Sequence, residues 1–582
     1  MKLGGFVGKR ILFVAPRYHD SIVGGADQYT RALAWELSRA GASVRVLTSR
    51  SVRFEPRGEL GIVWRDDLPA GEDTVDGIPV RRFGVWSPPE RWAESASARV
   101  RAQLDRDTAA ALRTLGRVAF GAGWYGAEPW GEGRFGRWSS GAGEVALPAS
   151  PVTGLTVDAL SLTEQRVTVV GIRGATRETL GAFELPRERW CEVVLDWDAR
   201  PFDTLRLEGS HRFVPGAQDP RTLSFVASAI TIRCADGSAP VLGARDRAEE
   251  VLDSLDDEAF ARTWRPLVEA RPRRLDFAYA ALRGPLSPGL AAACFAEACR
   301  ADAIVASGFP FVTMHLALAA GRRAKVPVYA LPFFHDRDLT HHWRHLYGAL
   351  RGARSTLALS RFHERHVAAA LGARTCYVGA SSPHWSLGRA LPDAPPPSTA
   401  EAVGSGDHVL RVAFVGRLTH SKGVATAVEA VRLLRARGHD VRLCVIGPDE
   451  SHGLGTGDGI ERLGTVPVER LQEVLAACDA LVLPSRHESF GLVVIEAWAA
   501  ARPVLADGAS GSLRTLISDG VDGYLCSGAE AYAARLAEWL ADPARRLAMG
   551  AAGRREVEAE HRWQHVVARF AELLAPSSAT RA

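Results

Sequence analysis

The chain has 582 residues, and at about 150 residues per domain this length predicts three or four domains. Hydrophobic residues make up 47% and charged residues 24%, which excludes a mostly disordered, collagen-like or coiled-coil protein. The formal net charge is only +4, so the composition gives no basic surface of the kind that nucleic-acid binding requires, and we expect no nucleic-acid partner.

Cysteine usage and hydropathy indicate the cellular compartment in which we expect the protein. The eight cysteines are scattered without a C-x-x-C pair, which favours buried free thiols in a reducing cytosol over a zinc site or a disulfide framework. No apolar stretch reaches the roughly 18 residues that span a bilayer, and the apolar run after Lys9 and Arg10 is too short for a signal sequence. We therefore expect a cytoplasmic protein, with peripheral contact at the inner membrane face left open.

The first region in chain order alternates strands and helices. A buried strand at 10–15 is followed by a loop with Gly24 and Gly25, a helix over 27–39 and a second strand. Further strands are predicted at the following positions: 78–85, 301–307, 326–334, 355–360 and 376–381. This alternation predicts a doubly wound parallel sheet, a Rossmann-like domain split into residues 1–118 and 247–390.

An insertion separates the two halves of that domain. Residues 119–246 are dense in glycine, lose helical periodicity and contain seven or so short alternating runs. This spacing predicts an inserted all-β sandwich. Tryptophan and tyrosine in GWYGAEPW, at its start, could stack on sugar faces or simply form aromatic corners of the core.

A second α/β region follows a linker. Residues 391–407 are rich in Pro, Ala and Gly, as linkers are, and a second Rossmann-like domain is predicted over 408–560. We expect a C-terminal helix at 561–576 and a disordered tail at 577–582. The expected fold class is thus α/β, with two doubly wound domains and an inserted β-sandwich.

The first chemistry-bearing motif is RVAFVGRLTHSKG at 411–423. A buried strand ends at Gly416, Arg417 follows at its carboxyl edge, and Lys422 precedes the next helix. Ligands of open α/β sheets bind at this edge, and a helix N-terminus beside two cations suits a diphosphate. The alternative is an ordinary turn with two solvated cations. The spacing is not that of a Walker A loop.

The second motif, PSRHESFGLVVIEAWAAARP at 484–503, places one carboxylate before a helix and one inside it. The carboxylates are Glu488 and Glu496, and free backbone N–H groups are expected around Gly491. Such N–H groups bind phosphate oxygens, and carboxylates accept hydrogen bonds from sugar hydroxyls. Taken singly, Glu488 could be an acid favoured by the helix dipole and Glu496 a buried paired acid.

Together, G-R-L-x4-K-G and E-S-F-G-x4-E-A resemble the donor-site signature of the retaining glycosyltransferases of family four, which have the GT-B fold. GGADQYTRALAWEL near the N-terminus resembles that family's glycine-rich loop and first helix. The resemblance covers roughly 1–115 and 250–575, and it implies a last helix that returns to the first domain.

The resemblance also implies a role for each matching residue. Arg417 and Lys422 would hold the donor diphosphate, Glu488 would contact the transferred sugar, and His335 would lie near that sugar. Glu496 would bind the ribose. The complete donor-binding set implied is as follows: Gly24, Gly25, Gly416, Ser489, Phe490, Gly491, Leu492 and Glu496. Arg417, Lys422, Glu488 and His335 form the implied catalytic set. No cofactor or metal is implied, because Arg and Lys neutralise the leaving group.

Two positions depart from the family pattern. Asp27 stands where the family usually has Glu, and Arg514 or Thr515 stands near an expected acid. Both affect the acceptor side more than the donor side. A cluster of histidines, His335 to His345 with Asp336 and Asp338, makes a metal site conceivable, but ordinary structural roles are the stronger expectation.

The function expected is a hexosyltransferase that moves a sugar with retention from a nucleotide-sugar to a glycan or lipid-linked acceptor, in bacterial polysaccharide or glycoconjugate synthesis. Three alternatives stay open: an inactive glycan-binding or scaffold protein of the same fold, a nucleotide-sugar epimerase, and a glycan phosphorylase, which the scarcity of lysines disfavours. The oligomeric state is left undetermined.

Overall fold

The computed structural model describes residues 6–22, 24–57, 60–115, 117–130, 135–215, 221–243, 252, 255, 257–391, 409–448, 457 and 459–575. The predicted linker, apart from Leu391, and the predicted tail lie outside the described residues. Contacts divide the chain into two compact units: residues 1–94 with 276–582, and residues 95–275.

The N-terminal sheet of the first unit has eight strands in the order β21-β20-β19-β18-β1-β2-β6-β5. The strands are β1 (Arg10–Val14), β2 (Ser43–Ser49), β5 (Gly71–Val75), β6 (Ile78–Phe83), β18 (Ala303–Ser307), β19 (Val328–Leu331), β20 (Ser355–Ala358) and β21 (Thr375–Tyr377). All pairs are parallel except β5 with β6. Central strands such as β18 are buried along their whole length, which explains their continuous apolar sequence.

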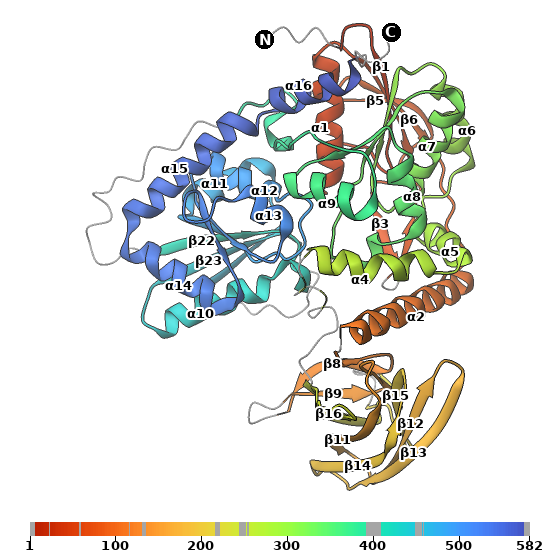
Figure 1. Cartoon of the computed structure of the whole chain (residues 1–582). Coiled ribbons are helices and arrows are strands. Elements are labelled where there is room, and N and C mark those ends of the chain that lie inside the picture. Colours follow the sequence, from red (N-terminus) through yellow and green to blue (C-terminus); the bar gives the residue numbers. More distant parts are fainter. Residues whose placement is uncertain are drawn as a thin grey trace. The chain divides into compact units, whose positions relative to one another are not determined.

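Helices connect these strands, and a short hairpin lies beside them (Figure 1). The elements are α1 (Gly25–Arg39), β3 (Phe54–Arg57), β4 (Gly61–Trp64), α5 (Arg273–Arg283), α6 (Pro288–Ala298), α7 (Val312–Ala324), η2 (Leu339–His341), α8 (Arg344–Gly352), α9 (Arg361–Leu371) and η3 (Pro383–Trp385). The β5–β6 hairpin was not predicted. It turns at Asp76 and Gly77, both with positive φ, which is the Asp-Gly signal of a tight hairpin.

The C-terminal sheet has six parallel strands in the order β24-β23-β22-β25-β26-β27. They are β22 (Leu410–Val415), β23 (Val441–Ile446), β24 (Ile460–Gly464), β25 (Ala480–Leu483), β26 (Val504–Asp507) and β27 (Gly523–Cys526). The helices with them are η5 (His420–Lys422), α10 (Val424–Ala436), α11 (Val468–Ala477), α12 (Leu492–Ala499), α13 (Gly511–Leu516), α14 (Gly528–Ala541) and α15 (Pro543–Glu560).

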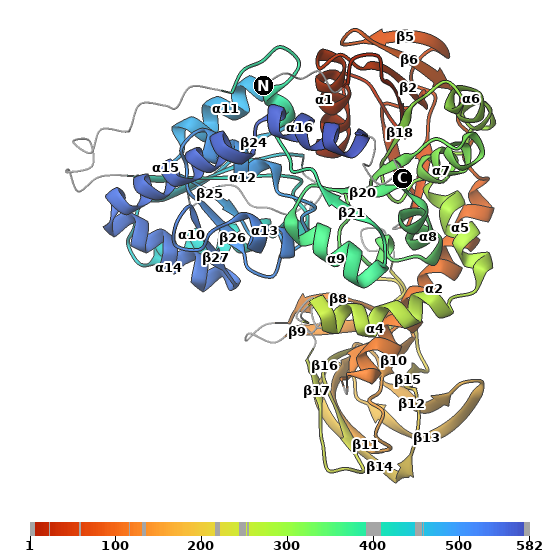
Figure 2. The same ribbon diagram turned by 45° about the horizontal axis from the view of Figure 1, so that its top comes forward.

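The last helix, α16 (Trp563–Leu574), lies against α1 in both ribbon views (Figures 1 and 2). The rings of Trp563 and Tyr29 are 5.2 Å apart, and Phe570 stacks on Phe6. The Tyr329 hydroxyl also donates to the Leu573 carbonyl oxygen. Aromatic packing of this kind ties the C-terminal helix to the N-terminal sheet.

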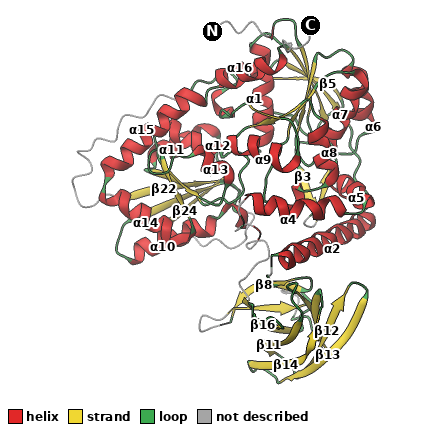
Figure 3. Ribbon diagram, viewed as in Figure 1, coloured by secondary structure: helices red, strands yellow, loops and turns green. Residues whose placement is uncertain are grey.

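The second unit is built around two antiparallel sheets (Figure 3). One has the order β13-β12-β15-β10-β7 and the other β14-β11-β16-β9-β8, with β17 beside β16. The strands are β7 (Ala119–Phe120), β8 (Trp124–Pro129), β9 (Phe135–Ser139), β10 (Ala142–Ala146), β11 (Val152–Ser161), β12 (Gln165–Arg173), β13 (Thr176–Leu185), β14 (Cys191–Arg200), β15 (Thr204–Gly209), β16 (Phe225–Cys234) and β17 (Val241–Gly243). Val169 and Leu207 of one sheet share a hydrophobic core with Val157 and Ile230 of the other.

Helices α2 (Glu90–Thr114) and α4 (Asp257–Ala270) flank these strands in the sequence. The predicted insertion, 119–246, encloses all the strands, and the compact unit extends beyond it through these helices. Within the unit, the buried Arg271 guanidinium lies 2.5 Å from the Asp107 carboxylate. The α/β fold class is confirmed, with two sheets that are parallel apart from the β5–β6 pair and an inserted antiparallel β region. In the part of the chain that the structure describes, no helix is long and apolar enough to cross a bilayer.

Candidate functional site

The first part of the candidate site lies where β22 ends and α10 begins. Gly416 follows β22 with a φ of 155°, and η5 leads to Gly423, which caps α10 with a φ of 73°. A Cβ on Gly423 would lie 2.1 Å from the carbonyl oxygen of Pro484. Only glycine fits this left-handed, close approach to the loop after β25. The turn therefore holds Lys422 against that loop.

Gly423→Ala is expected to lower the free energy of unfolding by about 1–3 kcal/mol, because the added methyl group must displace the Pro484 carbonyl. Urea denaturation measures this loss. Gly438→Ala is the matched control: Gly438 has a φ of 88°, but nothing lies within 4 Å of its added Cβ. Equal losses in the two variants would show that the contact with Pro484 is not what requires glycine.

Arg417 belongs to the same turn, and Gly447 packs against it. Arg417 is exposed directly after Gly416. Gly447, which the sequence analysis missed, follows β23 with a φ of 137°, and a Cβ there would lie 1.9 Å from the Gly416 carbonyl oxygen. The sequence signal for this position is the glycine that directly follows the buried strand, in the sequence VIG.

Lys422 and Glu488 form the central contact of the site. The Lys422 Nζ donates to Glu488 Oε1 at 2.6 Å, and their side chains are 19% and 11% exposed. Burial raises the pKa of Glu488, but the charge and hydrogen bond of Lys422 outweigh it, and the pKa lies below its ordinary value. Glu488 is therefore ionised at neutral pH, as a shielded carboxylate beside the Lys422 side chain.

His335 approaches this pair from the N-terminal sheet, four residues after β19. Burial lowers the pKa of His335 to about 3, helped by the charges of His341 and Lys422 and opposed by Asp338 and Glu488. The charges of Lys422 and Glu488 both act on His335, so the predicted catalytic histidine lies within the electrostatic influence of the ion pair. His335 is neutral at physiological pH, so one ring nitrogen can accept a hydrogen bond.

The predicted glycine loop and α12 meet at their helix starts. Gly24 caps α1 in extended conformation, and a Cβ on Gly25 would lie 3.7 Å from Leu492 Cδ1, at the first residue of α12. Gly491 caps α12 with a φ of 98°. The first N–H groups of both helices lack partners inside their helices, and both helix dipoles favour an anion. The arrangement suits a diphosphate between α1 and α12.

Ser489 and Phe490 contribute by their backbone more than by their side chains. The Ser489 carbonyl oxygen accepts from His363 Nδ1 at 2.9 Å, which joins this loop to α9. Phe490 is 2% exposed, and its ring packs 5.5 Å from that of His561. Ser489 and Phe490, which the resemblance assigns to donor binding, therefore lie in a loop that is anchored to the N-terminal domain.

Glu496 lies on α12 and is engaged by residues that the sequence analysis did not single out. The Ser382 hydroxyl donates to Glu496 Oε1 at 2.7 Å, and His384 Nε2 is 3.5 Å from the same oxygen. Burial raises the pKa of Glu496, although His384 and Ser382 act against it. Both partners, Ser382 and His384, follow β21, in a segment for which the sequence predicted only the end of a strand. The second carboxylate oxygen, Oε2, gives this residue further acceptor capacity for a ribose.

The two departures from the family pattern have structural partners. The Asp27 carboxylate lies 2.5 Å from the Arg17 guanidinium, and burial raises the pKa of Asp27 despite this pairing. Arg514, on α13, donates to the carbonyl oxygens of Gly508 and Ala509 at 3.0 and 3.2 Å. Arg514 thus stabilises its own loop.

The histidine cluster forms a hydrogen-bonded network. His341 Nδ1 accepts from the His335 N–H at 3.0 Å, and His342 contacts the Tyr347 hydroxyl at 2.6 Å and the Asp336 carbonyl oxygen at 2.8 Å. Within the described residues, no group of three or more His, Cys, Asp or Glu side chains is placed to hold a metal ion.

The lowered pKa values of several histidines predict that the folded chain loses stability in acid. Burial lowers the pKa to about 3 for His335 and His342, and to about 4 for His315, His341 and His561. Because an unfolded histidine titrates near about 6.5, the unfolded state binds more protons between pH 6.5 and 4. Stability should be constant above pH 7 and fall steadily as the pH drops from 6.5 towards 4.

Thermal denaturation midpoints measured from pH 8 to 4 test this expectation. His341→Gln keeps an acceptor for the His335 N–H while removing one titrating group, so its midpoint should fall less steeply than that of the unmodified chain. A midpoint independent of pH down to 4.5 would contradict the assignment of neutral buried histidines.

The C-terminal domain matches a known family. Residues 401–556 match the family model "Glycosyl transferases group 1". A D-inositol 3-phosphate glycosyltransferase of Corynebacterium aurimucosum is 37% identical over 161 residues, covering 25% of this chain and 38% of that protein. An alpha-maltose-1-phosphate synthase of Mycolicibacterium smegmatis is 33% identical over 188 residues, covering 29% and 48%. The chain thus spans less than half the length of these curated relatives.

Solved structures give weaker likenesses over more of the chain. Sucrose-phosphate synthase from Thermosynechococcus elongatus is 14% identical, covers 97% of this chain and 98% of its own, and has a TM-score of 0.46. The crystal structure of HepE of Anabaena in complex with UDP-glucose is 19% identical, covers 52% of this chain and 88% of its own, and has a TM-score of 0.41.

Proposed function

We propose that this chain is a retaining glycosyltransferase that moves a hexose from a nucleotide-sugar to a glycan or lipid-linked acceptor. The observation that carries the proposal is the buried Lys422–Glu488 pair within electrostatic reach of the neutral His335. The family match over residues 401–556 and the names of the relatives support the same class of reaction.

In this proposal the donor diphosphate lies at the starts of α1 and α12. Lys422 and Arg417 stabilise the negative charge that grows on the leaving diphosphate as the bond to the sugar breaks. Fixed cations do this best in a site that excludes water, and the Lys422 side chain is only 19% exposed. No step in the proposal requires a metal, because these cations supply the positive charge.

The carboxylates and the histidine position the two halves of the donor. Glu488 accepts hydrogen bonds from hydroxyls of the transferred sugar, and His335 contacts that sugar from the N-terminal side. Glu496 accepts from the ribose hydroxyls. The separation of roles follows from their positions: Glu488 lies before α12, beside Lys422, and Glu496 lies about one turn inside α12.

The inserted β unit is proposed to help recognise a glycan acceptor. We further propose that the protein acts in the cytoplasm, with or without peripheral membrane contact, in polysaccharide or glycoconjugate synthesis. Deleting 119–246 should weaken the use of acceptor while leaving nucleotide binding intact, as measured by KM for acceptor and by calorimetry with the nucleotide.

Turnover of a defined donor panel tests the reaction. UDP-glucose, ADP-glucose, GDP-mannose and dTDP-glucose are each supplied with the full chain, and release of the nucleoside diphosphate is followed with and without added acceptor glycans. The anomeric configuration of the product, read by proton NMR, should be that of the donor. Inverted product would contradict retention, and conversion of the donor sugar without transfer would favour the epimerase alternative.

A further inference from the structure

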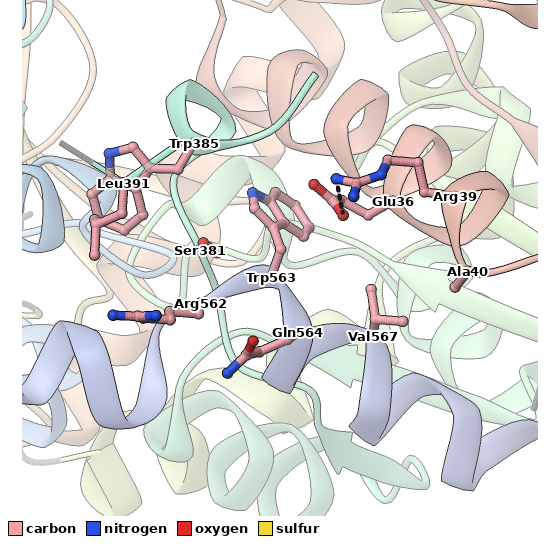
Figure 4. A pocket seen from close by; sticks show the side chains of 10 residues that line it. All are labelled: Glu36, Arg39, Ala40, Ser381, Trp385, Leu391, Arg562, Trp563, Gln564 and Val567. Carbon is pink, nitrogen blue, oxygen red and sulfur yellow. Dashed lines mark ion pairs between the residues drawn. The ribbon is translucent and has the colours of Figure 1, made fainter. Parts of the chain in front are cut away.

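A cavity lies beside the C-terminal end of α1. It has a volume of about 330 Å³ and is lined by the end of α1, the segment after β21 and the start of α16 (Figure 4). Trp563 stands in the middle of the group drawn, with Arg562 on one side and Glu36 and Arg39 on the other. A cavity of this size holds a small metabolite.

The cavity contains a buried polar group without a protein partner. Ser381 lines it and is 0% exposed, and the Ser381 hydroxyl has no hydrogen-bond partner among the described residues. Buried hydroxyl groups are normally hydrogen-bonded, since leaving one unpaired is unfavourable. The unpaired Ser381 hydroxyl is therefore available to an oxygen atom of a ligand.

One end of the cavity favours an anion. Arg562 caps the 12-residue helix α16 without a side-chain capping bond, and both Trp563 and Gln564 of its first turn line the cavity. The first N–H groups of a helix have no partner inside it, and the dipole there is positive. The exposed Arg562 guanidinium adds a full charge at the same end. This combination suits a phosphate group.

The other end favours hydroxyl groups. The Glu36 carboxylate accepts from the Ser386 hydroxyl at 2.9 Å and lies 4.0 Å from an Arg39 nitrogen, so it has further acceptor capacity. Trp563, between the two ends, and Trp385, on the side of Arg562, add indole rings to the lining (Figure 4). Tryptophan beside carboxylate and hydroxyl groups is the combination that binds sugar rings, which present an apolar face and a polar edge.

We propose that this cavity binds a small sugar phosphate, with the phosphate at the start of α16 and the sugar hydroxyls at Glu36 and Ser381. The donor site and this cavity share one short segment. Ser382, next to Ser381, donates to Glu496, and the Ser382 carbonyl oxygen accepts from Trp563 Nε1 at 2.9 Å. A ligand that fixes Ser381 and Trp563 also fixes the partner of Glu496. The sugar phosphate is thus an activator that tightens donor binding, a consequence that rests on the proposed function.

Binding is tested without any donor. Isothermal titration of the full chain with glucose 6-phosphate, glucose and inorganic phosphate should show glucose 6-phosphate binding at least about tenfold more tightly than either of the others. Arg562→Ala and Ser381→Ala should each lose about tenfold in this affinity, and Arg555→Ala, which removes an exposed arginine of α15, should lose nothing.

Three results would overturn the site. They are the absence of binding by glucose 6-phosphate, equal binding by inorganic phosphate, and unchanged binding in both Arg562→Ala and Ser381→Ala. Circular dichroism of each variant shows whether a loss reflects unfolding. Because the titration contains no nucleotide-sugar, failure of the proposed glycosyl transfer would leave this result standing.

The coupling is tested with the turnover assay. Saturating glucose 6-phosphate should lower KM for the donor about fivefold, and by linkage the donor nucleotide should tighten glucose 6-phosphate binding by the same factor. In Ser382→Ala, glucose 6-phosphate should still bind, but the effect on the donor should disappear. An unchanged donor KM with the cavity occupied would overturn the regulatory role and leave the binding site in place.

Discussion

Lys422→Ala is expected to lower kcat/KM for the nucleotide-sugar by about 10²–10³-fold, the loss typical of removing one preorganised group that stabilises developing negative charge. The Lys422 Nζ is held 2.6 Å from Glu488 and is largely shielded from water, so bulk solvent cannot replace it. Initial rates of nucleoside diphosphate release measure the effect. Lys422→Arg should recover part of the activity because it keeps the charge but not the geometry.

The controls separate chemistry from folding. Arg432→Ala removes an exposed cation from α10, the helix that Lys422 precedes, and should leave the rate unchanged. Lys422→Ala also leaves the Glu488 carboxylate buried without its cation, which is unfavourable. In Lys422→Ala/Glu488→Gln that unpaired charge is absent, so stability should recover while activity stays low. Full activity in a folded Lys422→Ala protein would contradict the assigned role.

Trp498→Ala is expected to lower the free energy of unfolding by about 3–5 kcal/mol. Trp498 is fully buried on α12, and its Nε1 donates to the Asp522 carbonyl oxygen at 3.0 Å. A Cβ on Gly553 of α15 would lie 2.2 Å from the Trp498 ring, so the indole fills the space that this glycine leaves. Removing the ring leaves a cavity between α12 and α15 and an unpaired carbonyl oxygen.

Urea denaturation followed by circular dichroism measures this loss. Trp86→Ala is the matched control, because Trp86 is 54% exposed and its removal creates no cavity. Since α12 also carries Glu496 and follows Gly491, Trp498→Ala should weaken nucleotide binding at temperatures where α12 loosens. A loss below about 1 kcal/mol would contradict this expectation, because it would mean that neighbouring side chains fill the space of the missing indole ring.

One physical rule places the residues that the two C-terminal motifs contribute to the candidate site. Lys422 and Glu488 are 66 residues apart, yet each follows a buried parallel strand, and the carboxyl ends of such strands meet at one edge. The same rule covers Gly416 and Gly491. Their positive φ values agree with the glycines that the motifs contain.

No comparable rule predicts which residues contact Glu496 or where His335 lies. Ser382 and His384 lie in an irregular segment after β21, and nothing in its sequence indicates a contact with Glu496. The position of His335 could be predicted only by resemblance, because Lys422 and Glu488, whose charges act on it, belong to another domain. Tertiary contacts between domains depend on how two sheets pack, which local periodicity does not encode.

The fold, like the site, contains elements that the sequence predicts and elements that it does not. The periodic strands and helices of the two parallel sheets were predictable, with ends shifted by one to three residues in most cases. The β5–β6 hairpin was missed although Asp76 and Gly77 carry a hairpin signal. The described residues of the inserted region form eleven strands where seven or so were predicted. Two-residue and three-residue strands such as β7 and β17 are too short to show alternation.

The measurement that tests the central claim most directly is nucleotide binding at the Lys422–Glu496 site. The unmodified chain, Lys422→Ala and Glu496→Ala are each denatured thermally with UDP, GDP, ADP or dTDP. One nucleotide at a hundred times its dissociation constant should stabilise the unmodified chain by about 2.7 kcal/mol, and both variants should lose that stabilisation. No stabilisation by any of the four, or equal stabilisation of both variants, would contradict a donor site built on these residues.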